Sequence, residues 1–140
     1  MKKFKRIICV DFDGVIHSYT SGWQGIANIP DPLVPGALEW LRRYTFIYDR
    51  IKNDEGDLAV QIYSARSRKR KGRQAMRKWL KTHGLEDIYL RELKFPSKKP
   101  AAFLTIDDRA ICFTGTFPTA REMLDFKPWY KRGDDNESSN

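Results

Sequence analysis

Two carboxylates one residue apart, Asp11 and Asp13, are the residues best suited to chemistry, and they directly follow the apolar run 7–10. That run is rich in β-branched residues, which is typical of a strand buried on both faces in a parallel sheet. Ligands of open α/β sheets bind outside the carboxyl ends of the strands, so both carboxylates are expected to face a binding crevice. Gly14 allows the backbone to turn away there.

Two later apolar runs also end in polar side chains. The run 58–63 is followed by Ser64, and the run 101–106 is followed by Asp107 and Asp108. The carboxyl ends of parallel strands meet at one edge of a sheet, so the acidic groups of the first and third runs should lie side by side. Carboxylate oxygens gathered in this way favour a hard divalent cation, and Mg²⁺ is the expected ion.

A basic loop precedes the third run and offers a cation to the same edge. It spans 94–100 and contains Lys98 and Lys99. Most residues of a charged run are ordinary solvated side chains, and this alternative stays open for both lysines. Lys99, next to Pro100, is the better candidate for the site.

The segments between these runs predict helices and one long loop. Residues 16–34 are rich in Gly, Ser, Asn and Pro and predict an irregular flap. Apolar residues at helical spacing predict helices over 35–51 and 72–83, with Gly84 ending the second. Weaker patterns predict the following elements: a strand at 88–90, a β-hairpin at 111–117 and a helix at 118–124. The alternation predicts a three-layer α/β fold, with helices on both faces of a mostly parallel sheet.

Length and composition predict a single domain. The chain has 140 residues, of which 41% are hydrophobic and 13% aromatic. We expect the catalytic domain to span 1–126 and a polar, disordered tail to span 127–140. Two cysteines without close spacing indicate neither a metal knuckle nor a disulfide, and no export signal or membrane span is expected, so the predicted location is the cytoplasm.

The four motifs together resemble the haloacid dehalogenase-like (HAD) superfamily of phosphohydrolases. That family has Asp-x-Asp after its first strand, Ser or Thr after its second, a Lys, and an acidic pair. The segments 11–15 (DFDGV) and 106–109 (IDDR) are specific matches, and the resemblance covers roughly residues 5–110. The chain looks like the small phage-type and bacterial members, so the resemblance implies a Rossmann-like HAD fold.

The resemblance also implies a role for each motif residue. Asp11 would attack phosphorus to form an aspartyl-phosphate, and Asp13 would protonate the leaving oxygen and later activate water. Ser64 and Lys99 would contact the phosphoryl oxygens. Further substrate contacts are expected from Gly14, Ser64, Ala65, Arg66 and Lys98. The implied Mg²⁺ ligands are Asp11, Asp13 (through its backbone carbonyl), Asp107 and Asp108.

The substrate is predicted from the size of the loops and from charge. Neither interval between motifs has room for the cap domain of HAD enzymes that act on small metabolites, so the site is expected to be open or covered by an oligomer neighbour. The net charge is +8, and nine basic residues lie between Arg66 and Lys81. A phosphorylated nucleotide or nucleic-acid end is therefore the favoured substrate, although such a run is also typical of a solvated helix face.

Two other types of acidic site do not fit these motifs. A calcium loop does not fit, because the glycine is misplaced and no Glu follows at the required distance. A phospho-acceptor receiver domain has its motifs in a different order. Asp13 favours phosphoester hydrolysis within the HAD superfamily, while phosphotransfer with the same residues stays open. A nucleic-acid-binding protein without useful turnover is the alternative function.

Two further residues lie near the motifs. Arg109 is expected to pair with a carboxylate, and His17 is a candidate substrate contact.

Overall fold

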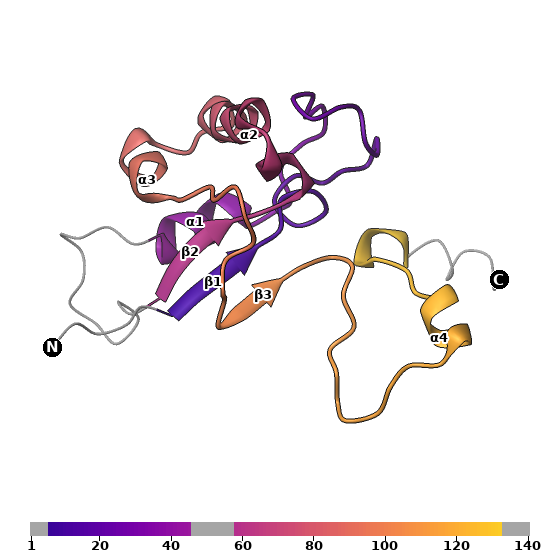
Figure 1. Ribbon diagram of the computed structural model, residues 1–140. Coiled ribbons are helices and arrows are strands. Elements are labelled where there is room, and N and C mark those ends of the chain that lie inside the picture. The colour runs from indigo at the N-terminus through magenta and orange to yellow at the C-terminus, as the bar shows by residue number, and fades with distance from the viewer. Residues whose placement is uncertain (1–5, 46–57, 133–140) are drawn as a thin grey trace, which may run out of the picture.

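The centre of the protein is a small open sheet of three parallel strands in the order β2-β1-β3 (Figure 1). The computed structural model describes residues 6–45 and 58–132. Strand β1 spans Arg6–Val10, β2 spans Leu58–Ile62 and β3 spans Leu104–Ile106. The strands therefore form where the apolar runs predict them, although β3 is much shorter than the run 101–106.

The register of the sheet brings its three carboxyl ends to one edge. Val10 of β1 is paired with Ile62 of β2 and with Ile106 of β3. Beyond these pairs the backbone N–H of Asp11 donates to the carbonyl of Ile106 at 2.9 Å, and Tyr63 donates to Val10 at 3.1 Å. The residues that follow the strands thus emerge next to one another.

Three helices contribute to the core on one face of the sheet. They are α1 (Ala37–Tyr44), α2 (Arg70–Thr82) and α3 (Asp87–Glu92). Alternate strand residues point to this face, because side chains along a strand alternate in direction. The buried core joins Ile8, Val10, Val60 and Ile62 of the strands to Leu41, Met76, Leu80 and Leu90 of the helices.

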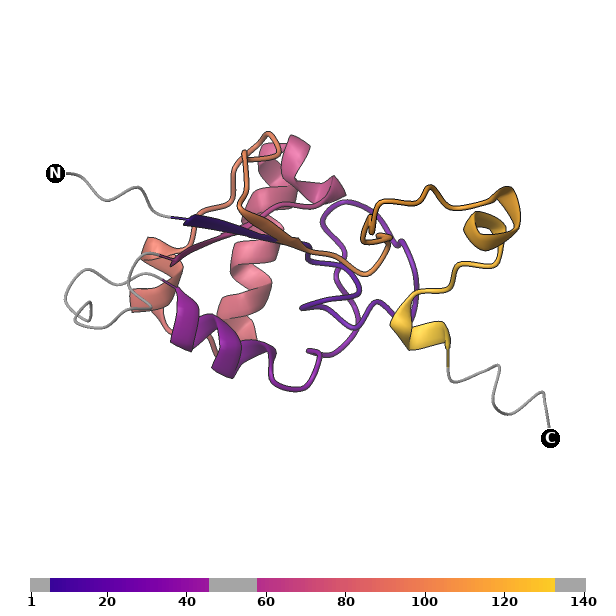
Figure 2. The ribbon, with the colours of Figure 1, turned by 90° about the horizontal axis from the view of Figure 1, so that it is seen from below.

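The opposite face of the sheet is covered differently from the prediction. Figure 2 shows α1 on one side of the sheet and the chain between α3 and β3 arching over the other. Within residues 6–45 and 58–132, no second layer of helices covers that face. The α/β class and the parallel sheet are confirmed, whereas the described part of the chain does not establish three layers.

The strand expected at 88–90 is wrong, because this segment lies in helix α3. The helix begins after Glu86, whose carbonyl accepts hydrogen bonds from Tyr89 and Leu90. Leu90 is buried and Ile88 is 43% exposed, so the segment presents one side to the core as a helix does. The extended partner of β2 comes later, where Ile62 donates to the carbonyl of Lys94 at 3.0 Å.

The hairpin expected at 111–117 is also wrong. The segment contains no strand and is exposed throughout, and its contacts include a ring pair, Phe113 and Phe117, with centroids 4.8 Å apart. The short helix predicted after it is confirmed as α4 (Ala120–Leu124).

The tail expected to be disordered from residue 127 begins with ordered structure, because Trp129–Lys131 form a 3-10 helix, η4. Residues 133–140 lie outside the described chain.

The remaining elements follow the sequence closely. The flap at 16–34 contains no helix or strand, and its ends are joined by a hydrogen bond from Val34 N to Ile16 O at 2.8 Å. Helix α1 begins after Gly36, and the part predicted beyond residue 45 lies outside the described residues. Both cysteines are free. Among the described helices, none has the length and apolar character needed to cross a membrane.

Candidate active site

Three carboxylates converge at the carboxyl edge of the sheet. Asp11 follows β1, and Asp107 and Asp108 follow β3, and each offers an oxygen within 4.8 Å of the others. These are three of the four predicted metal ligands, and the strand register is what brings them together. Oxygen donors packed at this density suit Mg²⁺ or another hard divalent cation.

Burial and the neighbouring carboxylates act together on Asp11. Burial raises the pKa of its carboxyl group, and the neighbouring carboxylates of Asp108 and Asp107 raise it further, to about 9 from an ordinary value of 3.8. The hydrogen bond from the backbone N–H of Phe12 to Asp11 Oδ1, at 2.8 Å, only partly offsets this effect. A cation in the cluster would favour the ionised form.

This pKa shift predicts a stability that depends on both pH and metal. Because the pKa of Asp11 is higher in the folded chain than in the unfolded chain, the protonated form of Asp11 favours folding. This contribution to stability is complete below the unfolded pKa of 3.8 and is lost as pH rises through the folded pKa of about 9. Without divalent cations, the Asp11 contribution should therefore weaken between pH 5 and pH 9. Added Mg²⁺ should raise the melting temperature more at pH 8.5 than at pH 5.5, as thermal unfolding would measure. An increase of equal size at the two pH values would contradict a site built on Asp11.

Gly14 allows the chain to pass closely beneath Asp108. Its φ angle is +83°, and a Cβ atom here would lie 2.2 Å from Asp108 Oδ2. Its carbonyl accepts a hydrogen bond from Trp129 Nε1 at 2.7 Å. Gly14 is predicted to contact substrate. In the structure, its missing side chain leaves room for the Asp108 carboxylate.

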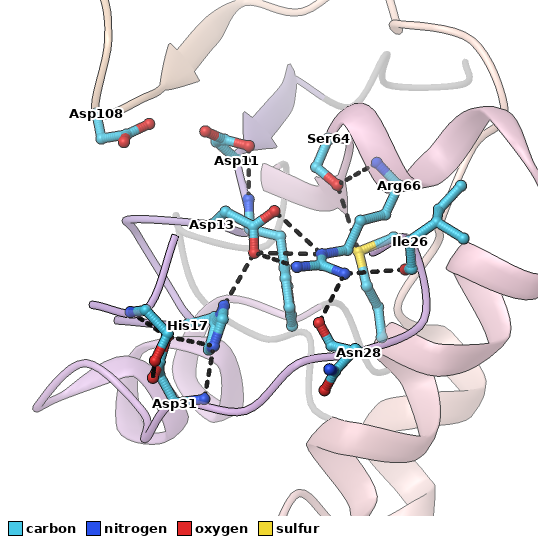
Figure 3. A network of polar contacts seen from close by, with 12 residues as sticks. Asp11, Asp13, His17, Ile26, Asn28, Asp31, Ser64, Arg66 and Asp108 are labelled. Carbon is cyan, nitrogen blue, oxygen red and sulfur yellow. Dashed lines mark hydrogen bonds and ion pairs between the residues drawn. The ribbon is translucent and has the colours of Figure 1, made fainter. Parts of the chain in front are cut away.

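Asp13 turns away from the cluster formed by the other three carboxylates. Its Oδ1 accepts from His17 Nδ1 at 2.9 Å, and both of its oxygens accept from the guanidinium of Arg66 (Figure 3). The side chain still lines the same cleft as Asp11. A metal ligand from Asp13 would therefore be its backbone carbonyl, as the sequence resemblance implies.

Arg66 is not the substrate-binding residue that the sequence predicts. Its side chain is fully buried, and its Nε lies 3.0 Å from Asp13 Oδ2. Its Nη1 donates to three flap carbonyls at 2.8–3.2 Å, those of Gly25, Ile26 and Asn28. A guanidinium engaged in this way fastens the flap to Asp13 and is not available at the mouth of the cleft.

His17 is likewise a buried link within the flap rather than a substrate contact. The backbone N–H of Asp31 donates to His17 Nε2 at 3.0 Å, and this contact assigns the ring proton to Nδ1. That Nδ1–H donates to Asp13. The flap thus reaches Asp13 twice, through His17 and through Arg66.

The hydroxyl and the lysine are found in the cleft as predicted. Ser64, Ala65 and Lys99 line the cavity of about 410 Å³ that also contains the carboxylates. Ser64 is the N-cap of the 3-10 helix η3 (Ala65–Arg68), and its Oγ accepts from Arg66 N at 3.1 Å. Lys98 is exposed and does not line the cavity, so the structure favours Lys99 as the motif lysine.

Sequence reasoning missed the C-terminal aromatic residues at the site. Tyr130 Oη lies 3.2 Å from Asp108 Oδ2, and Arg109 Nη2 lies 3.4 Å from the same hydroxyl. Arg109 also pairs loosely with Asp108, at 4.0 Å, as predicted. The signal was the pair Trp129-Tyr130 within a segment assigned to a polar tail, because large aromatic side chains are uncommon in disordered segments.

Comparison with known proteins gives no match to this chain, whether among family models, curated proteins or solved structures. The resemblance to the HAD superfamily therefore stays a prediction from the sequence motifs. The chemistry of the cleft has to be argued from its own residues.

Proposed function

We propose that this protein is a Mg²⁺-dependent phosphomonoester hydrolase that acts through an aspartyl-phosphate on Asp11, on a capless, three-layer HAD-like scaffold. One observation carries the proposal: the carboxylates of Asp11, Asp107 and Asp108 converge within 4.8 Å, in a cleft shared with Ser64 and Lys99. The same residue types in the same chain order define the motifs of HAD phosphohydrolases.

The three converging carboxylates fit a magnesium ion. Burial, together with the neighbouring carboxylates, raises the pKa of Asp11, and a bound cation would favour its ionised form. Asp11, Asp107 and Asp108 would hold the ion, with the backbone carbonyl of Asp13 as a further donor. When bound, Mg²⁺ neutralises these carboxylates and withdraws charge from a phosphoryl oxygen.

In the proposed first step, a carboxylate oxygen of Asp11 attacks the phosphorus of a phosphomonoester. A bond forms between that oxygen and phosphorus, the bond to the leaving alkoxide breaks, and the alkoxide takes a proton from Asp13. In the second step water attacks the phosphorus of the aspartyl-phosphate and gives its proton to Asp13. Inorganic phosphate leaves, and Asp11 is restored as a carboxylate.

Asp13 keeps an acceptor site that is suited to this proton. Its Oδ1 accepts from both His17 and Arg66, whereas among the described residues Oδ2 accepts from Arg66 Nε alone, at 3.0 Å. A carboxylate oxygen has two lone pairs, so Oδ2 retains one for a proton. Arg66 and His17 would hold the carboxylate in one orientation while that proton is transferred.

Ser64 and Lys99 would act on the transferred phosphoryl group. Both line the cleft, and Lys99 supplies positive charge beside the acidic cluster. In phosphoryl transfer the charge is spread over the equatorial oxygens, which a hydroxyl donor and an ammonium group stabilise. The Ser64 hydroxyl already caps η3, so its position in the cleft is fixed.

Phosphate release tests this proposal. Purified protein should release phosphate from a generic phosphomonoester with Mg²⁺ and lose this activity with a chelator. The panel should include 5′- and 3′-phosphorylated oligonucleotides, mononucleotides and sugar phosphates, with the nucleotides as the expected better substrates. No phosphate release from any member of the panel, with either Mg²⁺ or Mn²⁺, would contradict the proposed function.

The second candidate is a nucleic-acid-binding protein without useful turnover. The basic run favours it, because Arg68, Lys69, Arg70 and Lys71 are all exposed at the start of α2. This alternative predicts oligonucleotide binding that weakens with salt, is indifferent to end groups and releases no phosphate. The same panel therefore separates the two candidates.

A further inference from the structure

We propose that the flap residues Tyr19 and Trp23 form an aromatic subsite that stacks the nucleobase attached to the reacting phosphate. Both side chains line the cleft that contains Asp11 and Asp13. The inference rests on the proposed function, since it names the substrate class of the same cleft. The ligand chemistry is a nucleobase, which either a mononucleotide or the end of a nucleic acid could supply.

Trp23 has the exposure and the support that a stacking platform needs. It is 46% exposed, although it belongs to the wall of a cleft. The guanidinium carbon of Arg66 lies 4.8 Å from the centre of its ring, and the Arg66 side chain is fully buried. The cation therefore supports the indole from the protein side, and the exposed part of the ring is left for a ligand.

The same guanidinium fixes the position of this platform relative to the reacting groups. Arg66 Nε lies 3.0 Å from Asp13 Oδ2, while Arg66 Nη1 donates to the carbonyls of Gly25 and Ile26, just beyond Trp23 in the flap. A base stacked on Trp23 would thus lie at a set position relative to Asp13. Such preorganisation reduces the entropy lost when a ligand is ordered in the cleft.

Tyr19 has a strained backbone conformation of a kind that is common at binding sites. Its φ angle is +61°, and among the described residues no other non-glycine residue has a positive φ. Bulky side chains rarely adopt this region, and residues held there cluster at ligand clamps and active sites. Its ring contacts the buried His17 edge-on, with centroids 6.1 Å apart, and so lies on a fixed support.

The charges around the cleft favour a nucleic-acid end over a free mononucleotide. Ala65 lines the cleft, and the exposed side chains of Arg68, Lys69 and Arg70 follow within five residues. Cations that follow a cleft residue so closely in the chain suit the backbone phosphates of neighbouring nucleotides. Base stacking tolerates any sequence, because every base has a π-face.

Matched substrates with and without a base test the subsite. kcat/KM is measured with Mg²⁺ for thymidine monophosphate against deoxyribose phosphate, and for a phosphorylated oligonucleotide against the same strand with an abasic terminal nucleotide. In the unmodified protein the base should raise kcat/KM about 5- to 100-fold. Trp23→Leu should bring that ratio close to 1, and Trp23→Phe should keep most of it. A larger base effect in the oligonucleotide pair would identify the nucleic-acid end as the source.

Phe117→Leu is the matched control, because Phe117 is 82% exposed and lies outside the residues that line the cleft. It should leave the ratio unchanged. An equal ratio in Trp23→Leu and the unmodified protein would overturn the subsite, as would equal kcat/KM for the two members of each pair. If no substrate releases phosphate, the proposed function fails, and the subsite is then tested by measuring oligonucleotide binding. Oligonucleotide quenching of tryptophan fluorescence that survives Trp23→Leu would then overturn it.

Discussion

Asp11→Asn is expected to lower kcat for Mg²⁺-dependent phosphate release by at least about 10³-fold. The neutral amide cannot attack phosphorus as a carboxylate does, so the aspartyl-phosphate cannot form. The change also removes one of the three charges that converge within 4.8 Å and so weakens the cation site. Phosphate release under saturating substrate, with Mg²⁺ titrated in both proteins, measures the two losses separately.

The same variant should be more stable than the unmodified protein in the absence of metal. Burial and the neighbouring carboxylates raise the pKa of Asp11 to about 9, so near neutral pH its carboxylate is unfavourable in the folded chain. Removing it should raise the metal-free melting temperature at pH 8.5 and reduce the effect of pH. Loss of activity together with a gain in stability separates removal of the nucleophile from damage to the fold.

Asp125→Asn provides the matched control. Asp125 pairs with Arg121 at 3.2 Å, and its side chain is 65% exposed, away from the residues that line the cleft. The same chemical change there should leave phosphate release unaltered. Undiminished phosphate release in Asp11→Asn would exclude Asp11 as the nucleophile, and with it the proposed mechanism.

The acidic cluster could be predicted because it depends on the pairing of parallel strands. Asp11 and Asp107 each follow a buried apolar run, and parallel strands end at a common edge. No side-chain packing had to be known. Ser64 was predictable for the same reason, since it follows β2. The sequence favours Lys99 over Lys98 only because Pro100 is adjacent, and the lining of the cleft, which includes Lys99, supports that choice.

The surroundings of Asp13 could not be predicted in this way. Its partner Arg66 lies 53 residues later, within a run of nine basic residues that looks like a solvated helix face. Charge runs carry no information about which member turns inward. Arg66 does so because η3 begins directly after its N-cap Ser64 and directs Arg66 back toward the flap, where Gly25 and Ile26 supply carbonyl acceptors.

Helix α3 shows a second limit of pattern reading. Three apolar residues, 88–90, predict a strand, but a run this short fits either type of element. The acidic residues Glu86 and Asp87 at its start are the better signal, since acids favour the first turn of a helix. The aromatic pair at 129–130 was missed for another reason, because polar neighbours dominated the composition of the segment.

Arg66→Met is the substitution expected to destabilise the fold most. It leaves the Asp13 carboxylate, which is 13% exposed, without its cation and leaves the flap carbonyls of Gly25, Ile26 and Asn28 without a donor. Breaking a buried ion pair on one side costs about 3–5 kcal/mol, which corresponds to a melting temperature roughly 10–17 °C lower. Faster amide exchange in the flap should accompany the loss.

A double-variant cycle attributes this cost to the pair. Asp13→Asn in the Arg66→Met background removes the stranded charge, so the double variant should be more stable than Arg66→Met alone, with a coupling energy above about 1 kcal/mol. Recovery should be partial, because the three carbonyls still lack their donor. Arg121→Met, at a side chain that is 86% exposed, should change stability by less than about 0.5 kcal/mol. Equal losses in Arg66→Met and Arg121→Met would show that the buried guanidinium does not hold the flap to Asp13.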